Sequence, residues 1–443
     1  MPVDQTPRLQ SPPRSSPHSS PQRPPQTLAQ KLIAAACGRA SVEQGEIVTC
    51  AVDLAMFHDS SGPRRLQPML EELGASLWDP KKIVLVIDHY VPESDDESRR
   101  IVRIARDWAA GQQLPNVYDS VGICHVVVPQ HGHIRPGMFC VGGDSHSPTG
   151  GAFGAYMFGI GSTEMLGVAV TGKIWVKVPQ TLMMRWNGRL AAGVTAKDMM
   201  LHMIGRYGMN GGRYQAVEFC GEAVRALPMQ ERMTLSNMSA ELGSQVGLIA
   251  PDETTAAYLR AAGVTDALDL ARWQSDAGAD AEWHDFDAAS LAPQVAAPHS
   301  PANARDVDQY RDVPVQVAYI GACTGAKLED LRAAASVLRG RRLAPGMRLM
   351  VAPASRLDQQ QAEQEGVMQV LQDAGAQVLA TSCGACAGYG GSIPDDASVI
   401  STTARNFKGR MGSETAQVYL ASPYTVAASA VAGRIADPRE VMA

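Results

Sequence analysis

Short apolar runs alternate with amphipathic segments in the last third of the chain. Residues 315–320, 348–352 and 377–380 have the composition of buried strands, with Val, Leu and Ala prominent. Residues 327–339 and 358–373, which lie between them, carry apolar side chains at helical spacing. This alternation predicts right-handed crossovers between parallel strands, and therefore an α/β fold.

Three cysteines follow two of these predicted strands. Cys323 comes just after residues 315–320, and Cys383 and Cys386 come just after residues 377–380. The carboxyl ends of parallel strands meet at one edge of a sheet, where open α/β sheets bind their ligands. We therefore expect the three thiol groups to share one site.

Several chemistries suit three converging thiols. A Cys-x-x-Cys pair alone fits zinc, redox exchange or chance. A closed zinc site needs four protein ligands, and the sequence has no second Cys-x-x-Cys pair. Three thiolates can hold an iron–sulfur cubane and leave one iron free to act as a Lewis acid. The spacing places an iron–sulfur cluster first and leaves zinc or unrelated buried thiols as alternatives.

A similar pattern appears in the first half of the chain, where residues 82–88 and 138–142 resemble buried strands. Polar and charged residues stand at or just after the ends of these runs: Asp88, His89, Asp144, Ser145 and His146. Two carboxylate–imidazole units would then lie where a parallel sheet binds ligands. A carboxylate can orient an imidazole and raise its pKa, so both units are candidates for general acid–base catalysis.

Three further charged side chains are candidates for the same site. Glu218 lies within the apolar run 215–221, where an unpaired carboxylate is costly, so it pairs with an imidazole or stands in solvent on an edge strand. Arg405 and Arg410 flank an Asn-Phe turn that follows Cys386 in the sequence. Bidentate hydrogen bonds from two arginines would suit a di- or tricarboxylate substrate.

Length and composition indicate a globular enzyme with more than one core. The 443 residues exceed what one ordinary core can hold, and 45% of them are hydrophobic and 19% charged. Residues 1–26 are dominated by Pro, Ser, Gln and Arg, which predicts a disordered tail. We expect α/β domains at residues 27–180, at 181–300 with a linker, and at 301–443 with the cysteines.

The charge balance and cysteine usage narrow the possible partners and location. A formal charge of −6 gives no electrostatic reason to expect nucleic acid as the main partner. No apolar run approaches the length of a membrane span, and no signal-peptide pattern is present. The eight cysteines do not resemble a disulfide framework, so we expect reduced thiols and a cytoplasmic protein.

Five motifs occur in an order that is highly specific. They are Val86-Ile-Asp88-His89, Gly143-Asp-Ser-His-Ser-Pro-Thr-Gly-Gly151, Cys323-Thr324 with Leu328-Glu-Asp-Leu331, Cys383-Gly-Ala-Cys386, and Arg405-Asn-Phe-Lys-Gly-Arg410. Together they resemble the aconitase superfamily, most closely the large subunits of 3-isopropylmalate dehydratases and their relatives. The resemblance covers the chain from about residue 27 onward. It implies three α/β domains with parallel sheets, a cluster at the domain interface and no swivel domain.

The resemblance also implies roles for the candidate residues. It implies a [4Fe-4S] cluster on Cys323, Cys383 and Cys386, with substrate bound at the fourth iron. The implied carboxylate–imidazole pairs are Asp88 with His89, Asp144 with His125, and Glu218 with His146, and Ser145 lies in the same motif. The implied substrate-binding residues are His58, Asp59, Arg405 and Arg410.

The function implied is that of the large subunit of a hydro-lyase, which dehydrates or isomerises a 2- or 3-hydroxy di- or tricarboxylic acid such as 3-isopropylmalate. A small subunit would supply the swivel domain and a serine base, and His89 would assist the departure of water. Thr324-Gly325-Ala326-Lys327 replaces the usual Thr-Asn-Gly-Arg, and Ala404 replaces the Asn before Arg405. These departures keep another substituted malate, such as 2,3-dimethylmalate, as an alternative substrate. A non-catalytic, iron-responsive RNA-binding regulator is the alternative of another class, against which the acidic charge argues.

Overall fold

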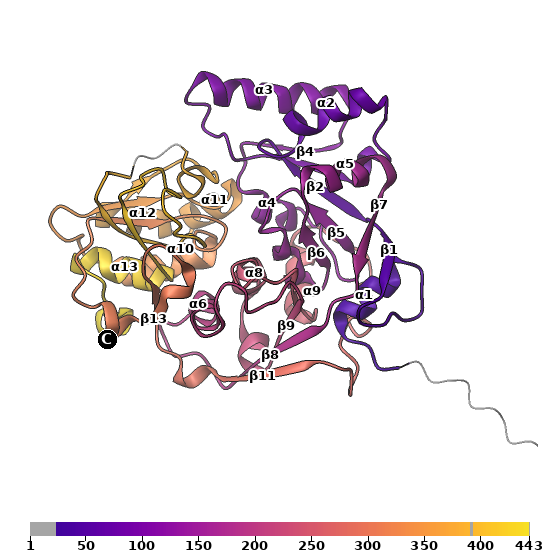
Figure 1. The fold of residues 1–443 in the computed structure, drawn as a ribbon. Helices are drawn as coiled ribbons and strands as arrows, with labels where there is room; N and C mark the ends of the chain where they lie inside the picture. Colours follow the sequence, from indigo (N-terminus) through magenta and orange to yellow (C-terminus); the bar gives the residue numbers. More distant parts are fainter. Residues whose placement is uncertain (1–23, 390–392, 443) are drawn as a thin grey trace, which may run out of the picture.

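The structure is a computed structural model that describes residues 24–389 and 393–442. The predicted tail, residues 1–26, therefore lies almost wholly outside the described residues. The strands of the described part form three larger sheets and one two-stranded ribbon. Figure 1 shows the third sheet with its helices, orange to yellow, beside the first sheet, indigo to purple, and helices α6 and α8 between the two.

The first sheet has five parallel strands in the order β4-β3-β2-β5-β6. They are β2 (Leu54–His58), β3 (Ile83–Ile87), β4 (Asn116–Asp119), β5 (Phe139–Gly142) and β6 (Tyr156–Gly159). The helices around them are α2 (Pro63–Leu73), α3 (Asp96–Gly111), α4 (Cys124–Gln130) and α5 (Ser162–Thr171). Leu85 packs with the core that includes α2, α3 and α5, whereas Val86 packs with the core that includes α4. Because both faces of β3 are covered, its sequence is continuously apolar.

The second sheet is also parallel, in the order β10-β9-β8-β11. Its strands are β8 (Thr181–Asn187), β9 (Ala216–Cys220), β10 (Val246–Ile249) and β11 (Glu282–Asp287). Helices α6 (Ala196–Tyr207) and α8 (Met229–Met238) contribute to its core. The ribbon pairs β1 (Ile47–Ala51) with β7 (Lys173–Lys177), and α1 (Leu28–Ala36) packs on β1.

The third sheet carries the predicted cysteine loops. Its seven strands run in the order β13-β12-β18-β17-β14-β15-β16, parallel from β18 to β16 and antiparallel at β12 and β13. They are β12 (Gln294–Ala296), β13 (Ala304–Asp306), β14 (Val317–Ile320), β15 (Arg348–Val351), β16 (Gln377–Val378), β17 (Ser398–Ser401) and β18 (Gln417–Ala421). The strands β14, β15 and β16 confirm the parallel arrangement predicted from the sequence.

One predicted helix is wrong in detail. Residues 358–373 were expected to form a single helix, but the structure has α11 (Arg356–Gln364) and α12 (Val367–Ala374). Gly366 separates them at φ 73°, a left-handed conformation that interrupts the helical path and that glycine adopts readily. The preceding helix, α10 (Leu328–Leu338), matches the predicted segment closely, with Lys327 in the N-cap position.

The three larger sheets take their strands from successive parts of the chain: residues 54–159, 181–287 and 294–421. The division into domains at 27–180, 181–300 and 301–443 stays a prediction. In the part of the chain that the structure describes, no helix combines the length and apolar character needed to cross a membrane.

Candidate active site

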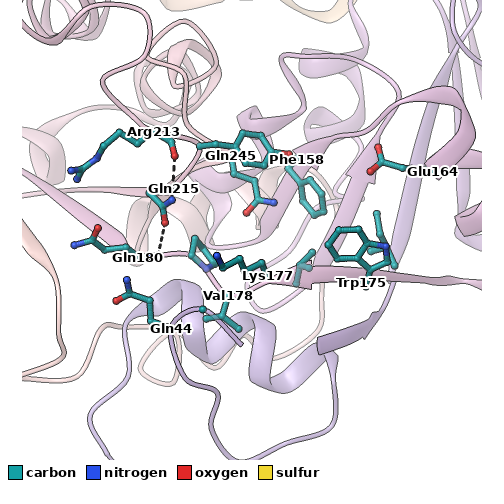
Figure 2. A pocket seen from close by; sticks show the side chains of 15 residues that line it. Gln44, Phe158, Glu164, Trp175, Lys177, Val178, Gln180, Arg213, Gln215 and Gln245 are labelled. Atoms are coloured by element: carbon teal, nitrogen blue, oxygen red, sulfur yellow. Dashed lines mark hydrogen bonds between the residues drawn. The ribbon is translucent and has the colours of Figure 1, made fainter. Parts of the chain in front are cut away.

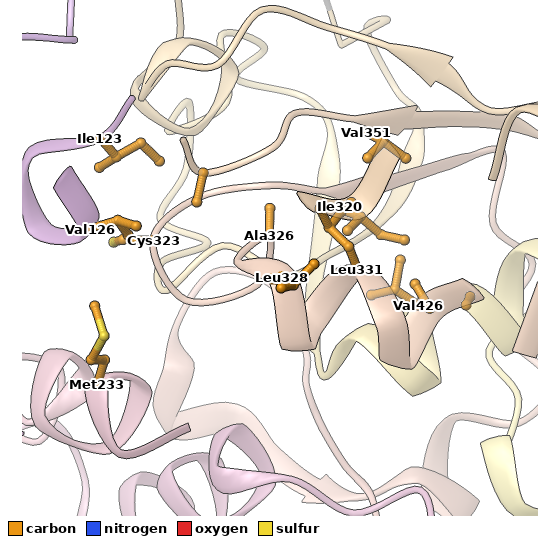
Figure 3. Packing of buried hydrophobic residues seen from close by; sticks show 14 of the residues in the cluster. Ile123, Val126, Met233, Ile320, Cys323, Ala326, Leu328, Leu331, Val351 and Val426 are labelled. Carbon is orange, nitrogen blue, oxygen red and sulfur yellow. The ribbon is translucent and has the colours of Figure 1, made fainter. Parts of the chain in front are cut away.

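The first cysteine lies on a turn that leaves the central strand β14. Cys323 is buried, and its Sγ accepts a hydrogen bond of 3.2 Å from Asn237 Nδ2 on α8. Cys323 belongs to an apolar cluster that also contains Ile123, the residue before α4, and Val126, which lies within α4 (Figure 3). The preceding Gly321 has no room for a side chain, because a Cβ would lie 2.3 Å from the Tyr319 hydroxyl. The turn therefore packs the Tyr319 hydroxyl directly against the chain that carries Cys323.

The other two cysteines lie on the loop after β16. The backbone N–H of Cys383 donates to Asp88 O at 3.1 Å, which docks this loop on the loop after β3. The three thiols are close enough to affect one another: burial and Cys386 raise the pKa of Cys323 to about 12. A hydrogen bond from Cys383 lowers the pKa of Cys386 to about 6. The structure thus brings Cys323, Cys383 and Cys386 to one edge of the third sheet.

The loops after β2 and β3 hold the first carboxylate–imidazole unit. Asp88 Oδ1 lies 2.7 Å from His89 Nδ1, and Asp88 Oδ2 accepts from the N–H of Cys124 at 2.7 Å. Asp59 accepts from the N–H of His89 at 3.1 Å, and the His58 ring stacks on the His89 ring with centroids 4.1 Å apart. Burial favours a neutral His89, but Asp88 and Asp59 outweigh it and raise the pKa of His89 to about 10. His89 is therefore a protonated imidazole at neutral pH.

His58 has the opposite electrostatic character. Burial and the neighbouring charge of His89 lower the pKa of His58 to about 4. Its Nε2 lies 3.1 Å from Gly143 O and 2.8 Å from Ser61 Oγ. A neutral His58 stacked on a protonated His89 gives two adjacent imidazoles that differ in charge.

Asp144 joins the second unit to the first. Its Oδ1 lies 2.7 Å from His125 Nε2 and accepts from the N–H of His146 at 2.8 Å, while its Oδ2 lies 3.9 Å from His89 Nε2. Burial alone would raise the pKa of Asp144, but His125 and His146 hold it well below its usual value. Asp144 is thus an anion surrounded by three imidazoles.

The third unit contains a residue that the sequence interpretation did not assign to the site. His146 Nε2 lies 2.9 Å from Glu241 Oε1, and the same oxygen accepts from Arg405 Nε at 2.6 Å. Arg405 Nη1 also donates to Ser145 Oγ at 3.0 Å. Burial opposes protonation of His146, but Glu241 outweighs it and raises the pKa of His146 to about 9. Glu241 therefore holds a histidine and an arginine together at the site.

The expected pairing of Glu218 with His146 is wrong. Glu218 lies on β9 and accepts from Ser275 Oγ at 2.7 Å, and its carboxylate also meets the backbone of Leu28 at the start of α1. Glu241, in the turn between α8 and β10, takes the position beside His146. No sequence signal assigned Glu241 to the site, because it lies in the turn after α8, which ends at Met238, and not at the carboxyl end of a predicted strand. Any catalytic role for Glu218 stays a prediction that these contacts do not support.

Replacing Glu218 with glutamine should stabilise the protein at pH 8. Burial raises the pKa of Glu218 from 4.5 to about 7, in spite of the hydrogen bond from Ser275. Between these values the folded protein binds the proton more tightly than the unfolded chain, so stability falls as pH rises, by up to about 3 kcal/mol. Glutamine keeps an acceptor for Ser275 and does not ionise. Urea unfolding of both proteins at pH 5 and pH 8 measures the effect, and an equal loss of stability in E218Q would contradict it.

Two residues that depart from the family pattern, Gly325 and Lys327, pack against neighbouring residues rather than face open space. Lys327 is fully buried, and its Nζ donates to Asp330 Oδ2 at 2.7 Å, to Cys323 O at 3.0 Å and to Thr234 Oγ1 at 3.0 Å. A Cβ on Gly325 would lie 2.1 Å from Thr402 Cβ. Lys327 is therefore occupied by structural contacts, and position 325 holds no side chain because the chain after β17 fills that space.

Two cavities have lining residues in common. A cavity of about 390 Å³ is lined by Asp144, Ser145 and Arg405, together with Tyr214 and Gln245. A larger one, of about 720 Å³, shares Tyr214 and Gln245 and extends towards the β1–β7 ribbon (Figure 2). The smaller cavity is lined by three of the candidate residues, whereas the larger one is lined by glutamines, Trp175 and Lys177 and by none of the candidate residues.

Comparison with known proteins places the chain in a family. Residues 30–433 match the Aconitase family (aconitate hydratase), so the chain belongs to the aconitase family. The 3-isopropylmalate dehydratase large subunit 1 of Methanopyrus kandleri is 42% identical over 416 residues, which cover 93% of this chain and 99% of the relative. The 3-isopropylmalate dehydratase large subunit of Moorella thermoacetica is 40% identical over 423 residues, which cover 94% and 99%. The holo form of Thermococcus kodakaraensis aconitase X covers 81% of this chain and 84% of its own, at 14% identity and a TM-score of 0.47.

Proposed function

We propose that this aconitase-family hydro-lyase is the large subunit of an enzyme that dehydrates 3-isopropylmalate or a close analogue. The identity of about 40% to proteins of that name over nearly the whole chain carries the proposal. It supports this substrate over 2,3-dimethylmalate and over a regulator that binds RNA. The convergence of three cysteines with three carboxylate–imidazole units is the structural observation that agrees with it.

Aconitase-family hydro-lyases generally use an iron–sulfur cluster, and we assign a 4Fe-4S cluster of this chain to Cys323, Cys383 and Cys386. Burial and the three cysteines raise the pKa of Tyr319 well above its usual value. Among the described residues, Tyr319 Oη and Arg410 Nε are buried without a hydrogen-bond partner. Unpartnered buried donors are costly, and an anionic cluster would supply acceptors. The residues present therefore fit the group.

The number of thiolates also favours a cluster over one zinc ion. A closed zinc site needs four protein ligands, whereas three thiolates can hold a cubane and leave one iron open to substrate. When bound, the cluster would supply a Lewis-acidic iron that polarises the departing hydroxyl.

Side chains of this chain would bind the substrate, donate a proton and hold the proton donor in place. Arg405 is held by Glu241 and presents its Nη1 beside Ser145, so it would bind a substrate carboxylate. His89, protonated through its contact with Asp88, would donate a proton to the hydroxyl as it leaves. Asp59 would fix the His89 loop through its backbone contacts rather than touch substrate.

A small subunit is the partner that this proposal requires. The relatives named above are large subunits, and the match covers 99% of their length. We infer that the partner carries the swivel domain and the serine base that removes the carbon-bound proton. The smaller cavity at Ser145 and Arg405 is the place where such a base would meet substrate.

Anaerobic reconstitution tests the function. The chain, loaded with iron and sulfide and mixed with its small subunit, should dehydrate 3-isopropylmalate, which the ultraviolet absorption of the unsaturated product would report. The large subunit alone should bind iron but show no turnover. Citrate, malate and 2,3-dimethylmalate serve as competing substrates. Absence of turnover on every acid, with a full complement of iron and sulfide, would refute the proposal.

A further inference from the structure

A buried lysine connects two loops of the candidate site. Lys197, in the first turn of α6, is 1% exposed. Its Nζ lies 2.6 Å from Thr402 O, 2.9 Å from Thr403 O and 3.2 Å from Thr324 Oγ1. Thr324 follows Cys323 directly, whereas Thr402 and Thr403 lead to Arg405. One side chain thus contacts both the turn with a candidate cluster ligand and the loop with a candidate substrate-binding arginine.

The hydrogen bonds identify Lys197 as a charged ammonium group. Two of its partners are carbonyl oxygens, which only accept. The third, the Thr324 hydroxyl, donates its own hydrogen to Thr402 O at 2.9 Å, so it accepts from Lys197. Nζ therefore donates three hydrogens, which a neutral amine cannot do.

This charge is held at an unfavourable place. A cation in the first turn of a helix opposes the helix dipole. Within the described residues, the ammonium group contacts neutral oxygens only, whereas the neighbouring buried Lys327 pairs with Asp330 at 2.7 Å. The carboxylate of Asp330 favours this charge without contacting it, and a buried charge that lacks a contacting ion-pair partner is destabilising.

The topology explains what the lysine can do there. β14 and β17 are parallel neighbours, so the turn with Thr324 and the loop with Thr402 leave the same edge of the third sheet. Lys197 lies on α6, which contacts β12 and β13 of the third sheet. The apolar residues of α6 belong to the core of the second sheet. Figure 1 shows α6 between the first sheet and the third sheet. The ammonium group of Lys197 therefore links the turn with Thr324 to the loop with Thr402 through hydrogen bonds, although α6 is not part of the third sheet.

We infer that Lys197 is a positioning residue of the reaction. By fixing the loop of Arg405 against the turn of Cys323, it sets where the guanidinium group presents the substrate carboxylate relative to the metal site. This inference rests on the proposed function, which gives Cys323 and Arg405 their roles. Lys197 itself contacts neither a cysteine sulfur nor Arg405 in the structure.

The test compares K197M with K327M in the cluster-loaded enzyme with its small subunit. K327M is the matched control, because it also removes a buried lysine next to Cys323 but does not touch the Arg405 loop. We expect both variants to keep wild-type iron and sulfide content and to unfold at a lower temperature. In K197M, KM for 3-isopropylmalate should rise about tenfold with kcat within about threefold of wild type, since a displaced Arg405 weakens ground-state and transition-state binding alike. The substrate concentration that changes the EPR spectrum of the reduced cluster should rise by the same factor.

Two results would overturn the inference. One is an unchanged KM and EPR titration in K197M, and the other is an equal rise of KM in K327M, which would make the effect one of general destabilisation. If K197M does not fold, T324V removes one acceptor and leaves the ammonium group; it should raise KM about threefold, and an unchanged KM would again overturn the inference. Failure of the proposed function is distinct, because the wild-type enzyme would then show no turnover.

Discussion

Replacement of Cys323 with serine is expected to lower the dehydration rate at least about a thousandfold, because a bound Lewis acid supplies several kcal/mol of transition-state stabilisation. Cys323 is buried in the turn after β14, and its sulfur accepts a hydrogen bond from Asn237 at 3.2 Å. With two thiols remaining, the site should lose iron and acid-labile sulfide as well. Metal analysis and the visible absorption of the reconstituted protein measure this loss alongside activity.

The matched control for this experiment is Cys37→Ser. Cys37 is a partly exposed cysteine at the end of α1, and its thiol donates to Ala34 O, a contact that a hydroxyl can replace. C37S should keep wild-type iron, sulfide and activity. Full retention of iron and activity in C323S would show that the cysteines do not hold the metal, and the assignment of the site would fail with it.

His89→Gln should lower kcat by about 10² to 10⁴, the usual contribution of a positioned proton donor. Glutamine can still contact Asp88 but cannot transfer a proton at neutral pH. Iron and sulfide content should not change, because His89 contacts carboxylates and not the cysteine sulfurs. His284→Gln, on β11 of the second sheet, is the matched control and should keep wild-type activity. A loss of kcat in H89Q below tenfold would remove His89 from the role of acid.

The pH dependence of kcat gives a second measure of His89. Its pKa is raised to about 10, so the acid is present through neutral pH and is lost as pH rises through that value. Asp88→Asn removes the carboxylate that contributes most to this rise. In D88N the alkaline fall of kcat should therefore occur at lower pH than in the wild type. An alkaline limb at the same pH in both enzymes would mean that another group titrates there.

Most of what the sequence could predict follows from one rule: residues just after parallel strands meet at the carboxyl edge of the sheet. Continuous apolar runs identified β3 and β14, and parallel pairing then required Asp88, His89 and Cys323 to stand at carboxyl edges. The two edges face each other in the structure, as the hydrogen bond from Cys383 N to Asp88 O shows. Residues that belong to the first and third sheets were therefore accessible to sequence reasoning.

The same rule did not identify the residues that the second sheet and its helices contribute to the site, for a physical reason. It contributes through α8 and the turn before β10, not through the carboxyl ends of its strands, so Asn237 and Glu241 reach the site from the other end. Glu218, on a strand of that sheet, was an apparent candidate because buried carboxylates are rare, yet its partner is Ser275. Lys197 gave no signal at all, since a lysine in the first turn of a helix is expected in solvent.

The close approach of Gly325 to Thr402 makes the side chains at these two positions sterically interdependent. A side chain at 325 would collide with the Cβ atom of Thr402, so every residue at 402 except glycine excludes it. Thr402 also anchors the cysteine turn, since its hydroxyl accepts from the N–H of Gly321 at 2.8 Å. An asparagine at 325 would therefore fit only if Thr402 or the backbone that carries it moved, so a change at one of these positions calls for a change at the other.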